Sequence, residues 1–175
     1  MKTTIKLFLF VLSVSIFSSC SDSSTSVDVT AADLVGVWNL VDINGEGTST
    51  TTINGQSITA DVTTTGRDYN FITEFTSNPN TVTGTGSYIA VSTSTFLGQT
   101  VTEEQLLSSI SGLDSGTWSL SGNVITTEVG GETNQIVVDE VTDNMLVLTA
   151  AFEETQQIQG ISVNFSGSVR IVLEK

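Results

Sequence analysis

The segment near the end of the chain alternates between apolar and polar residues with a period of two. From Ile161 to Leu173 every second residue is apolar or glycine, and only Val172 interrupts the polar positions between them. The alternating positions hold Ile161, Val163, Phe165, Gly167, Val169, Ile171 and Leu173. Because successive side chains of a strand point to opposite faces, this pattern predicts a strand with one face on a core and the other in water.

Shorter segments of the same kind run through most of the chain. They are rich in Val, Ile, Thr and aromatic residues, and Gly, Asn and Asp separate them. The predicted strands cover residues 34–43, 56–64, 69–75, 81–91, 116–120, 124–129, 134–141 and 145–152. Between the first two, Asn54 and Gly55 predict a two-residue hairpin turn, because both tolerate a positive φ. Strands joined by short turns predict an all-β fold, an antiparallel up-and-down β-barrel of eight or more strands, with a two-sheet sandwich as the alternative.

One segment breaks the pattern of strands. Residues 102–105 read Thr-Glu-Glu-Gln, which is typical of a capping box with acidic residues in the first turn of a helix. The apolar residues Leu106, Leu107, Ile110 and Leu113 would then form one face. We therefore expect one short helix within a long connection, residues 98–115, which either gates the barrel as a binding loop or closes one end as a plug.

The first twenty residues have the order of a signal peptide. Two lysines precede an apolar run over residues 7–17, and two serines lie directly before Cys20, the only cysteine. This order resembles a bacterial lipoprotein signal, in which the chain is cut before the cysteine and a lipid is attached to it. The resemblance implies a membrane anchor at Cys20. Because Ser21 rather than Asp follows, it also implies the cell outer membrane.

These features predict three parts of the chain. A lipoprotein signal peptide covers residues 1–19, a flexible lipid-anchored tether rich in Ser and Thr covers residues 20–32, and the barrel domain covers residues 33–175. The apolar run of the leader is shorter than the 18 to 20 residues, roughly, that a membrane span needs. A lipidated Cys20 leaves no disulfide, so the core alone must stabilise the domain, which its length allows.

The charge of the chain excludes one class of partner. The sequence has 19 acidic and 5 basic residues, a net charge of −14, and removal of the leader leaves only Arg67, Arg170 and Lys175 as basic side chains. Such an acidic chain is repelled by phosphate backbones, so we expect no nucleic-acid partner.

No motif for catalysis is found in the sequence. Histidine is absent, and we find no nucleophile elbow, P-loop, Rossmann glycine pattern or metal motif. We therefore expect no catalytic residue, no metal site and no cofactor, and a protein that is not an enzyme. A glycosidase is a distant alternative, because no spacing singles out a pair of carboxylates among the 19 acids.

The first predicted strand carries a Gly-x-Trp sequence at Gly36 and Trp38. Together with residues 116–123, which read GTWSLSGN, and the ending over residues 169–173, it resembles lipocalins and the lipocalin-like bacterial lipoproteins. The resemblance implies a calycin-type barrel in which Trp38 packs at the closed end. It also implies that Arg170 on the last strand packs across that tryptophan.

The resemblance implies that the barrel binds a small hydrophobic or amphipathic ligand. Aromatic residues on the predicted strands are the candidates to line it: Phe71, Phe75, Tyr88, Trp118, Phe152 and Phe165. The alternative is that these residues fill the barrel as core. The protein would then be a structural or interaction lipoprotein that binds an envelope protein or a glycan through its surface.

Overall fold

The computed structural model describes residues 27–96, 98–158 and 160–175. The predicted signal peptide, the lipid attachment at Cys20 and residues 20–26 of the predicted tether lie outside the described residues. The helix is α1 (Ala31–Leu34), and the strands are β1 (Gly36–Ile53), β2 (Gln56–Phe75), β3 (Thr81–Phe96), β4 (Gln99–Leu107), β5 (Ser115–Ser121), β6 (Val124–Val129), β7 (Glu132–Val141), β8 (Met145–Ile158) and β9 (Ile161–Glu174). Within the described part of the chain, no helix has the length and apolar character needed to cross a membrane.

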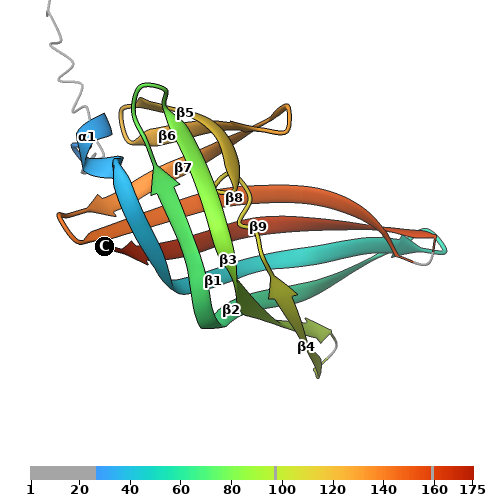
Figure 1. Cartoon of the computed structure of the whole chain (residues 1–175). Helices are drawn as coiled ribbons and strands as arrows, with labels where there is room; N and C mark the ends of the chain where they lie inside the picture. Colours follow the sequence, from blue (N-terminus) through green and yellow to red (C-terminus); the bar gives the residue numbers. More distant parts are fainter. Residues whose placement is uncertain (1–26, 97, 159) are drawn as a thin grey trace, which may run out of the picture.

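Eight of the strands close into an antiparallel barrel (Figure 1). The order around it is β1-β2-β3-β5-β6-β7-β8-β9, and β9 pairs again with β1. The ninth strand, β4, is hydrogen-bonded to β3 alone among the described strands. The structure confirms the predicted all-β antiparallel barrel, and the chain does not form the two-sheet alternative.

Two predicted strands, 56–64 and 69–75, are a single strand, β2. Its pairing with β3 shifts register between Arg67 and Asn70, where Asp68 has a φ of 54°. The sequence pattern changes phase at this irregularity, so it predicts two strands where the structure has one. The hairpin turn predicted between β1 and β2 is confirmed, because Asn54 (φ 52°) and Gly55 (φ 80°) both have a positive φ.

The short helix predicted within the long connection is wrong. Gln99–Leu107 is strand β4, which pairs with the second half of β3 from Tyr88 opposite Leu107 onward. This half of β3 would otherwise leave its backbone groups without a partner on that side, and the threonines near the start of β4 favour a strand. Leu106 is 70% exposed whereas Leu113 is fully buried, so the apolar residues do not share one face.

The closed end of the barrel is built around Trp38, which is fully buried. Its indole Nε1 donates a hydrogen bond to the Leu34 carbonyl at 2.7 Å, so α1 covers this end. The Lys175 ammonium lies 4.4 Å from the ring centroid, a cation–π contact. Gly36 has a φ of 138°, and a side chain there would meet Lys175 at 3.3 Å. Glycine is therefore required at the first position of the Gly-x-Trp sequence.

Arg170 does not take the place that the resemblance implied for it. Its guanidinium lies 3.8 Å from the Asp42 carboxylate, and half of the side chain is exposed. The position of Arg170 on β9 has the opposite parity from the buried Ile171 and Leu173. Lys175, beyond the end of β9, supplies the cation over Trp38 instead.

Three hairpins, β1–β2, β3–β4 and β8–β9, extend past the other end of the barrel (Figure 1). We call this end the mouth and the extensions the arms. For example, β7 pairs with β8 only as far as Ala150, whereas β8 continues beside β9 to Ile158. The arms carry cross-strand threonine pairs, including Thr93 with Thr102 at 3.2 Å between hydroxyl oxygens.

Candidate functional site

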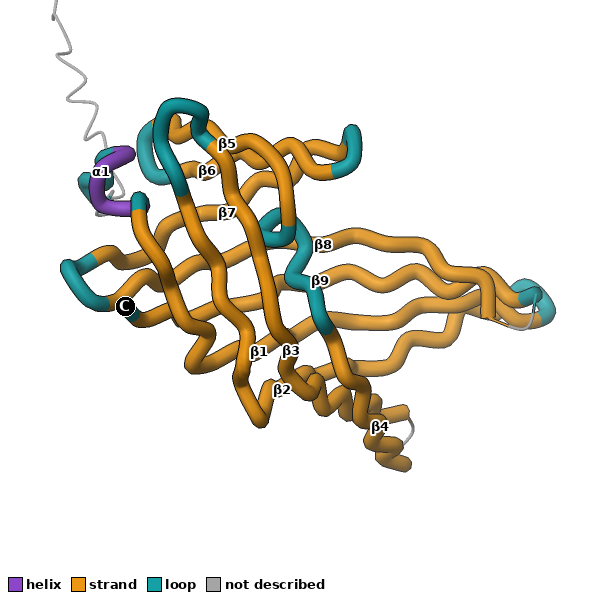
Figure 2. The backbone as a smooth tube through the Cα atoms, viewed as in Figure 1, coloured by secondary structure: helices purple, strands orange, loops and turns teal. Residues whose placement is uncertain are grey.

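The connection between β4 and β5, residues 108–114, turns into the barrel and closes its mouth (Figure 2). We call it the plug. Ile110 is 5% exposed and Leu113 is fully buried, and both belong to the main core cluster. The plug is a tight turn, because the Leu113 N–H donates to the Ile110 carbonyl at 2.8 Å. Of the two roles expected for the long connection, the structure shows it in the closing position.

Hydrogen bonds from both ends hold the plug in place. The Asp114 carboxylate accepts a hydrogen bond from the Ile110 N–H at 2.7 Å, and the Asp114 carbonyl accepts one from the Gly84 N–H on β3. The Ser111 hydroxyl donates to the Asn134 side chain on β7 at 3.1 Å. The plug is therefore attached to two strands on different sides of the barrel.

A glycine on β3 makes room for the plug. A Cβ at Gly84 would lie 2.5 Å from the Leu113 carbonyl oxygen and 2.6 Å from the Phe71 ring. Any side chain at this position would displace the plug or the aromatic ring beneath it. The seating of Leu113 thus depends on the absence of a side chain at Gly84.

Two buried hydroxyl groups lie next to the plug. Thr73 on β2 and Thr127 on β6 are fully buried, and neither Oγ1 has a hydrogen-bond partner within the described structure. Thr73 is the cross-strand neighbour of Gly84, and a Cβ at Gly112 would lie 3.0 Å from the Thr127 Oγ1. A buried hydroxyl without a partner costs about 1–3 kcal/mol. The barrel therefore holds unused polar groups where a bound molecule could form hydrogen bonds.

Four of the six predicted ligand-lining residues lie together inside the barrel. Phe71 and Tyr88 form an edge-to-face pair nearer the mouth, with ring centroids 6.2 Å apart. Phe75 and Trp118 form a second pair toward the closed end, with centroids 5.7 Å apart. All four are at most 4% exposed, so they pack as core in this structure. Their part in ligand binding stays a prediction.

The other two predicted residues lie on the arms, apart from these pairs. Phe152 on β8 is 42% exposed, and Phe165 on β9 is half-buried. Phe152 is the cross-strand neighbour of Gly167, so no side chain covers it from that position. Neither residue belongs to the core cluster that contains the two aromatic pairs.

Burial sets the protonation of the groups at the base of the plug. It raises the pKa of Tyr88 to about 12, and the negative charge of Asp114 acts in the same direction. Burial also raises the pKa of Asp114, although the hydrogen bond from the Ile110 N–H opposes this shift. Tyr88 is therefore a neutral phenol throughout the physiological range.

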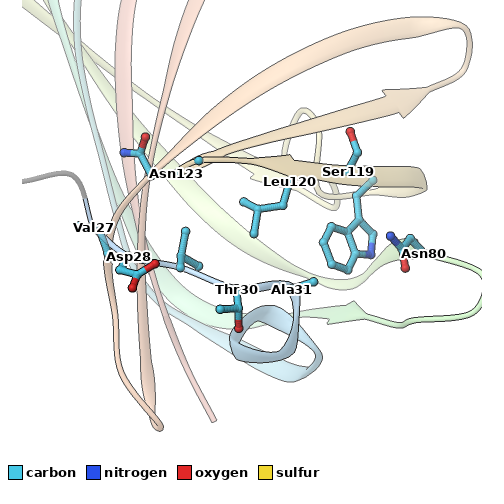
Figure 3. A pocket seen from close by; sticks show the side chains of 11 residues that line it. Val27, Asp28, Thr30, Ala31, Asn80, Ser119, Leu120 and Asn123 are labelled. Atoms are coloured by element: carbon cyan, nitrogen blue, oxygen red, sulfur yellow. The ribbon is translucent and has the colours of Figure 1, made fainter.

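A hollow lies at the closed end, between the N-terminal segment and the β5–β6 hairpin (Figure 3). Its volume is about 860 Å³, within the range of small-molecule sites. Leu120 projects into it from β5, and Asn80, Asn123 and Asp28 supply polar groups around it. The hollow is open to solvent on one side, whereas the barrel interior is filled by core side chains.

A closed antiparallel barrel with a buried Gly-x-Trp tryptophan at its base defines a lipocalin-type domain. The model of the lipocalin-like domain family matches residues 34–148, and the chain belongs to this family. The matched region contains Trp38 and the plug, whereas Arg170 lies beyond it. No curated protein and no solved structure matches the chain. The fold is one that binds small ligands and is generally without catalysis.

No sequence motif marks Thr73, Thr127 or Asp114 as part of the site. A signal for the two threonines was present, because each occupies an inward position in its strand. Thr73 lies between the inward Phe71 and Phe75, and Thr127 follows Ile125 at the same parity. Nothing in the local sequence distinguishes Asp114 from the other acidic residues.

Proposed function

We propose that this chain is a lipid-anchored protein of the outer membrane that binds a small hydrophobic or amphipathic molecule without transforming it. We further propose that the ligand enters through the mouth and takes the place of the plug. One observation carries the proposal: a connecting loop, and not a strand, completes the core at Ile110 and Leu113, next to two buried hydroxyl groups that have no hydrogen-bond partner among the described residues.

The chemistry of this position indicates the kind of ligand. Displacement of Ile110 and Leu113 would leave an apolar space of about two branched aliphatic side chains, beside the Phe71–Tyr88 pair. The Oγ1 atoms of Thr73 and Thr127 can each donate one hydrogen bond and accept others. A molecule with a branched or short-chain apolar body and one or two polar atoms suits this space.

The proposed anchor fixes how the barrel faces the membrane. Six residues lie between Cys20 and Val27, so a fully extended tether of seven Cα-to-Cα steps reaches at most about 25 Å. Residues 27–31 lie against the closed end. The mouth and the arms therefore point away from the membrane, and the ligand is collected from the surrounding space.

The first experiment is native mass spectrometry of the full chain purified from a Gram-negative envelope, followed by denaturation to identify what is released. A bound apolar or amphipathic molecule near unit occupancy supports the proposal. An unliganded mass that no member of a panel of short-chain alcohols, acids and esters shifts would overturn the binding function. It would favour the alternative of an interaction protein, for which the filled barrel is the supporting observation.

A reversible lock tests the place of binding. The Ser111 hydroxyl and the Asn134 side chain are hydrogen-bonded at 3.1 Å, so the pair Ser111→Cys and Asn134→Cys is chosen to join the plug to β7 by a disulfide, whose formation is verified by titration of free thiols. Oxidation should abolish ligand binding, and reduction should restore it. Binding that persists in the oxidised variant but is lost in Leu120→Asp would place the ligand in the hollow at the closed end, and so would refute the role of the plug.

A further inference from the structure

Strand β4 has one edge to which no strand of the described residues is hydrogen-bonded. It pairs with β3 over its whole length, from Gln99 to Leu107, and no other described strand pairs with it. The hydrogen-bonding groups on its outer edge therefore point away from the sheet. A free edge of nine residues is long enough to accept another strand by β-augmentation.

The side chains of β4 are unusually apolar for such an exposed position. Leu106 is 70% exposed and Val101 is 58% exposed, and these are the two highest values among the exposed large hydrophobic residues of the described chain. The two residues have opposite parity, so they lie on opposite faces of the strand. An added strand with apolar residues opposite them would cover both.

Two acidic residues lie between these apolar positions. Glu103 has the parity of Val101, and Glu104 has the parity of Leu106. The Glu104 carboxylate accepts a hydrogen bond from Arg67 on β2 at 2.7 Å, whereas Glu103 makes no ion pair within the described residues. Each face of the edge thus presents one apolar and one acidic group.

We propose that β4 binds an extended strand of a partner protein with the pattern apolar, any residue, basic, basic, any residue, apolar. In such a strand the basic residues lie opposite Glu103 and Glu104, and the apolar residues lie opposite Val101 and Leu106. The pattern reads the same in both directions, so it fits a parallel or an antiparallel partner. Opposite charges in cross-strand pairs stabilise a sheet, and β4 supplies only the negative members.

The same charges oppose pairing with a second copy of this chain. The antiparallel register that overlaps all of β4 places Glu103 directly opposite Glu103 of the second copy. A shift of one residue in each strand toward Leu107 places Glu104 opposite its equivalent instead. Like charges directly opposite each other destabilise a sheet, so the edge favours a basic partner over itself.

A peptide pair tests the proposal on the full chain in detergent. The probe has the sequence of residues 99–107 with lysine in place of both glutamates, and the control peptide keeps the glutamates. We expect the lysine peptide to bind about tenfold more tightly, as measured by fluorescence anisotropy of a labelled peptide. Amide hydrogen exchange of β4 should slow when the lysine peptide is bound.

Charge reversal on the protein supplies the matched test. Glu103→Lys with Glu104→Lys should reverse the preference, so that the glutamate peptide binds more tightly. Asp139→Lys with Glu140→Lys makes the same charge change on β7, a strand that is hydrogen-bonded to a neighbour on both sides. This variant should still bind the lysine peptide more tightly than the glutamate peptide. The charge-reversed β4 variant should also form a heterodimer with the unmodified chain, whereas neither chain should dimerise alone.

Three results would overturn the proposal. One is the absence of binding by the lysine peptide at submillimolar concentration. Another is equal binding to the unmodified chain and to the β4 variant. The last is an equal loss of binding in the β7 variant, which would assign the attraction to the overall charge of the protein. None of these results depends on whether the barrel binds a small molecule.

Discussion

Replacement of Leu113 by alanine tests whether the segment that holds it is a plug that a ligand can displace or an ordinary part of the core. Leu113 is fully buried, and its backbone carbonyl oxygen lies against Gly84 on β3, where the absence of a side chain leaves room for the plug. Truncation of a buried leucine to alanine costs about 2–5 kcal/mol, depending on how far the site collapses. Because hydrogen bonds at both ends hold the plug, we expect little collapse and a loss of about 3 kcal/mol in the free energy of unfolding.

The new space in the Leu113→Ala variant should bind a small amphipathic molecule. The assay is urea denaturation followed by tryptophan fluorescence, with and without isobutanol. At ten times its dissociation constant a ligand specific for the folded state adds ~1.4 kcal/mol. Leu146→Ala on β8 is the matched control, because Leu146 is equally buried but lies on a strand away from the plug.

Two results would refute this reasoning. A loss below about 1 kcal/mol would mean that Leu113 is not part of a rigid core, against the range for buried leucines. Equal recovery by isobutanol in the Leu113→Ala and Leu146→Ala variants would mean that any cavity in this barrel accepts the alcohol. The space under the plug would then have no special affinity for a ligand.

Three further predictions follow from the described contacts and from the sequence. The pKa of Tyr88 is raised to about 12, so the folded state keeps a proton that the unfolded state loses near pH 10. The free energy of unfolding should therefore fall by up to ~2.7 kcal/mol between pH 10 and 12. In urea titrations, Tyr88→Phe should remove this part of the fall. Trp38→Ala should cost about 3–5 kcal/mol, measured in the same way, and a loss well under 1 kcal/mol would contradict its role at the base of the barrel. Cys20→Ala should release the protein from membranes, and unchanged fractionation would overturn the anchor.

The alternation of apolar and polar residues was enough to predict the strands, because it records which face of each strand is buried, but it fits a barrel and a two-sheet sandwich equally. It assigned Ile171 and Leu173 to the core and Arg170 to the opposite face. The parity also argued against contact between Arg170 and Trp38, which the family resemblance implied. The structure agrees with the parity, since Lys175 is the cation over Trp38.

Local sequence failed where distant partners decide the structure. Residues 102–105 have the pattern of a helix start, but β3 extends far enough to hold this segment as a strand. The plug is likewise set by contacts with β3 and β7 that no local pattern records. The inward parity of Thr73 and Thr127 does not distinguish them as polar groups of the site, because threonine is common throughout the chain.

The seam between β1 and β9 ties folding to the completion of the domain. These strands pair from Asn39 opposite Glu174 to Thr51 opposite Val163, so the first strand of the barrel cannot complete its hydrogen bonding until the last strand is present. Contacts this distant in sequence make folding slow, typically milliseconds to seconds. Until β9 is made, β1 keeps an unpaired edge and the barrel stays open. A growing chain with this topology therefore cannot close its barrel until β9, the last strand, has been synthesised.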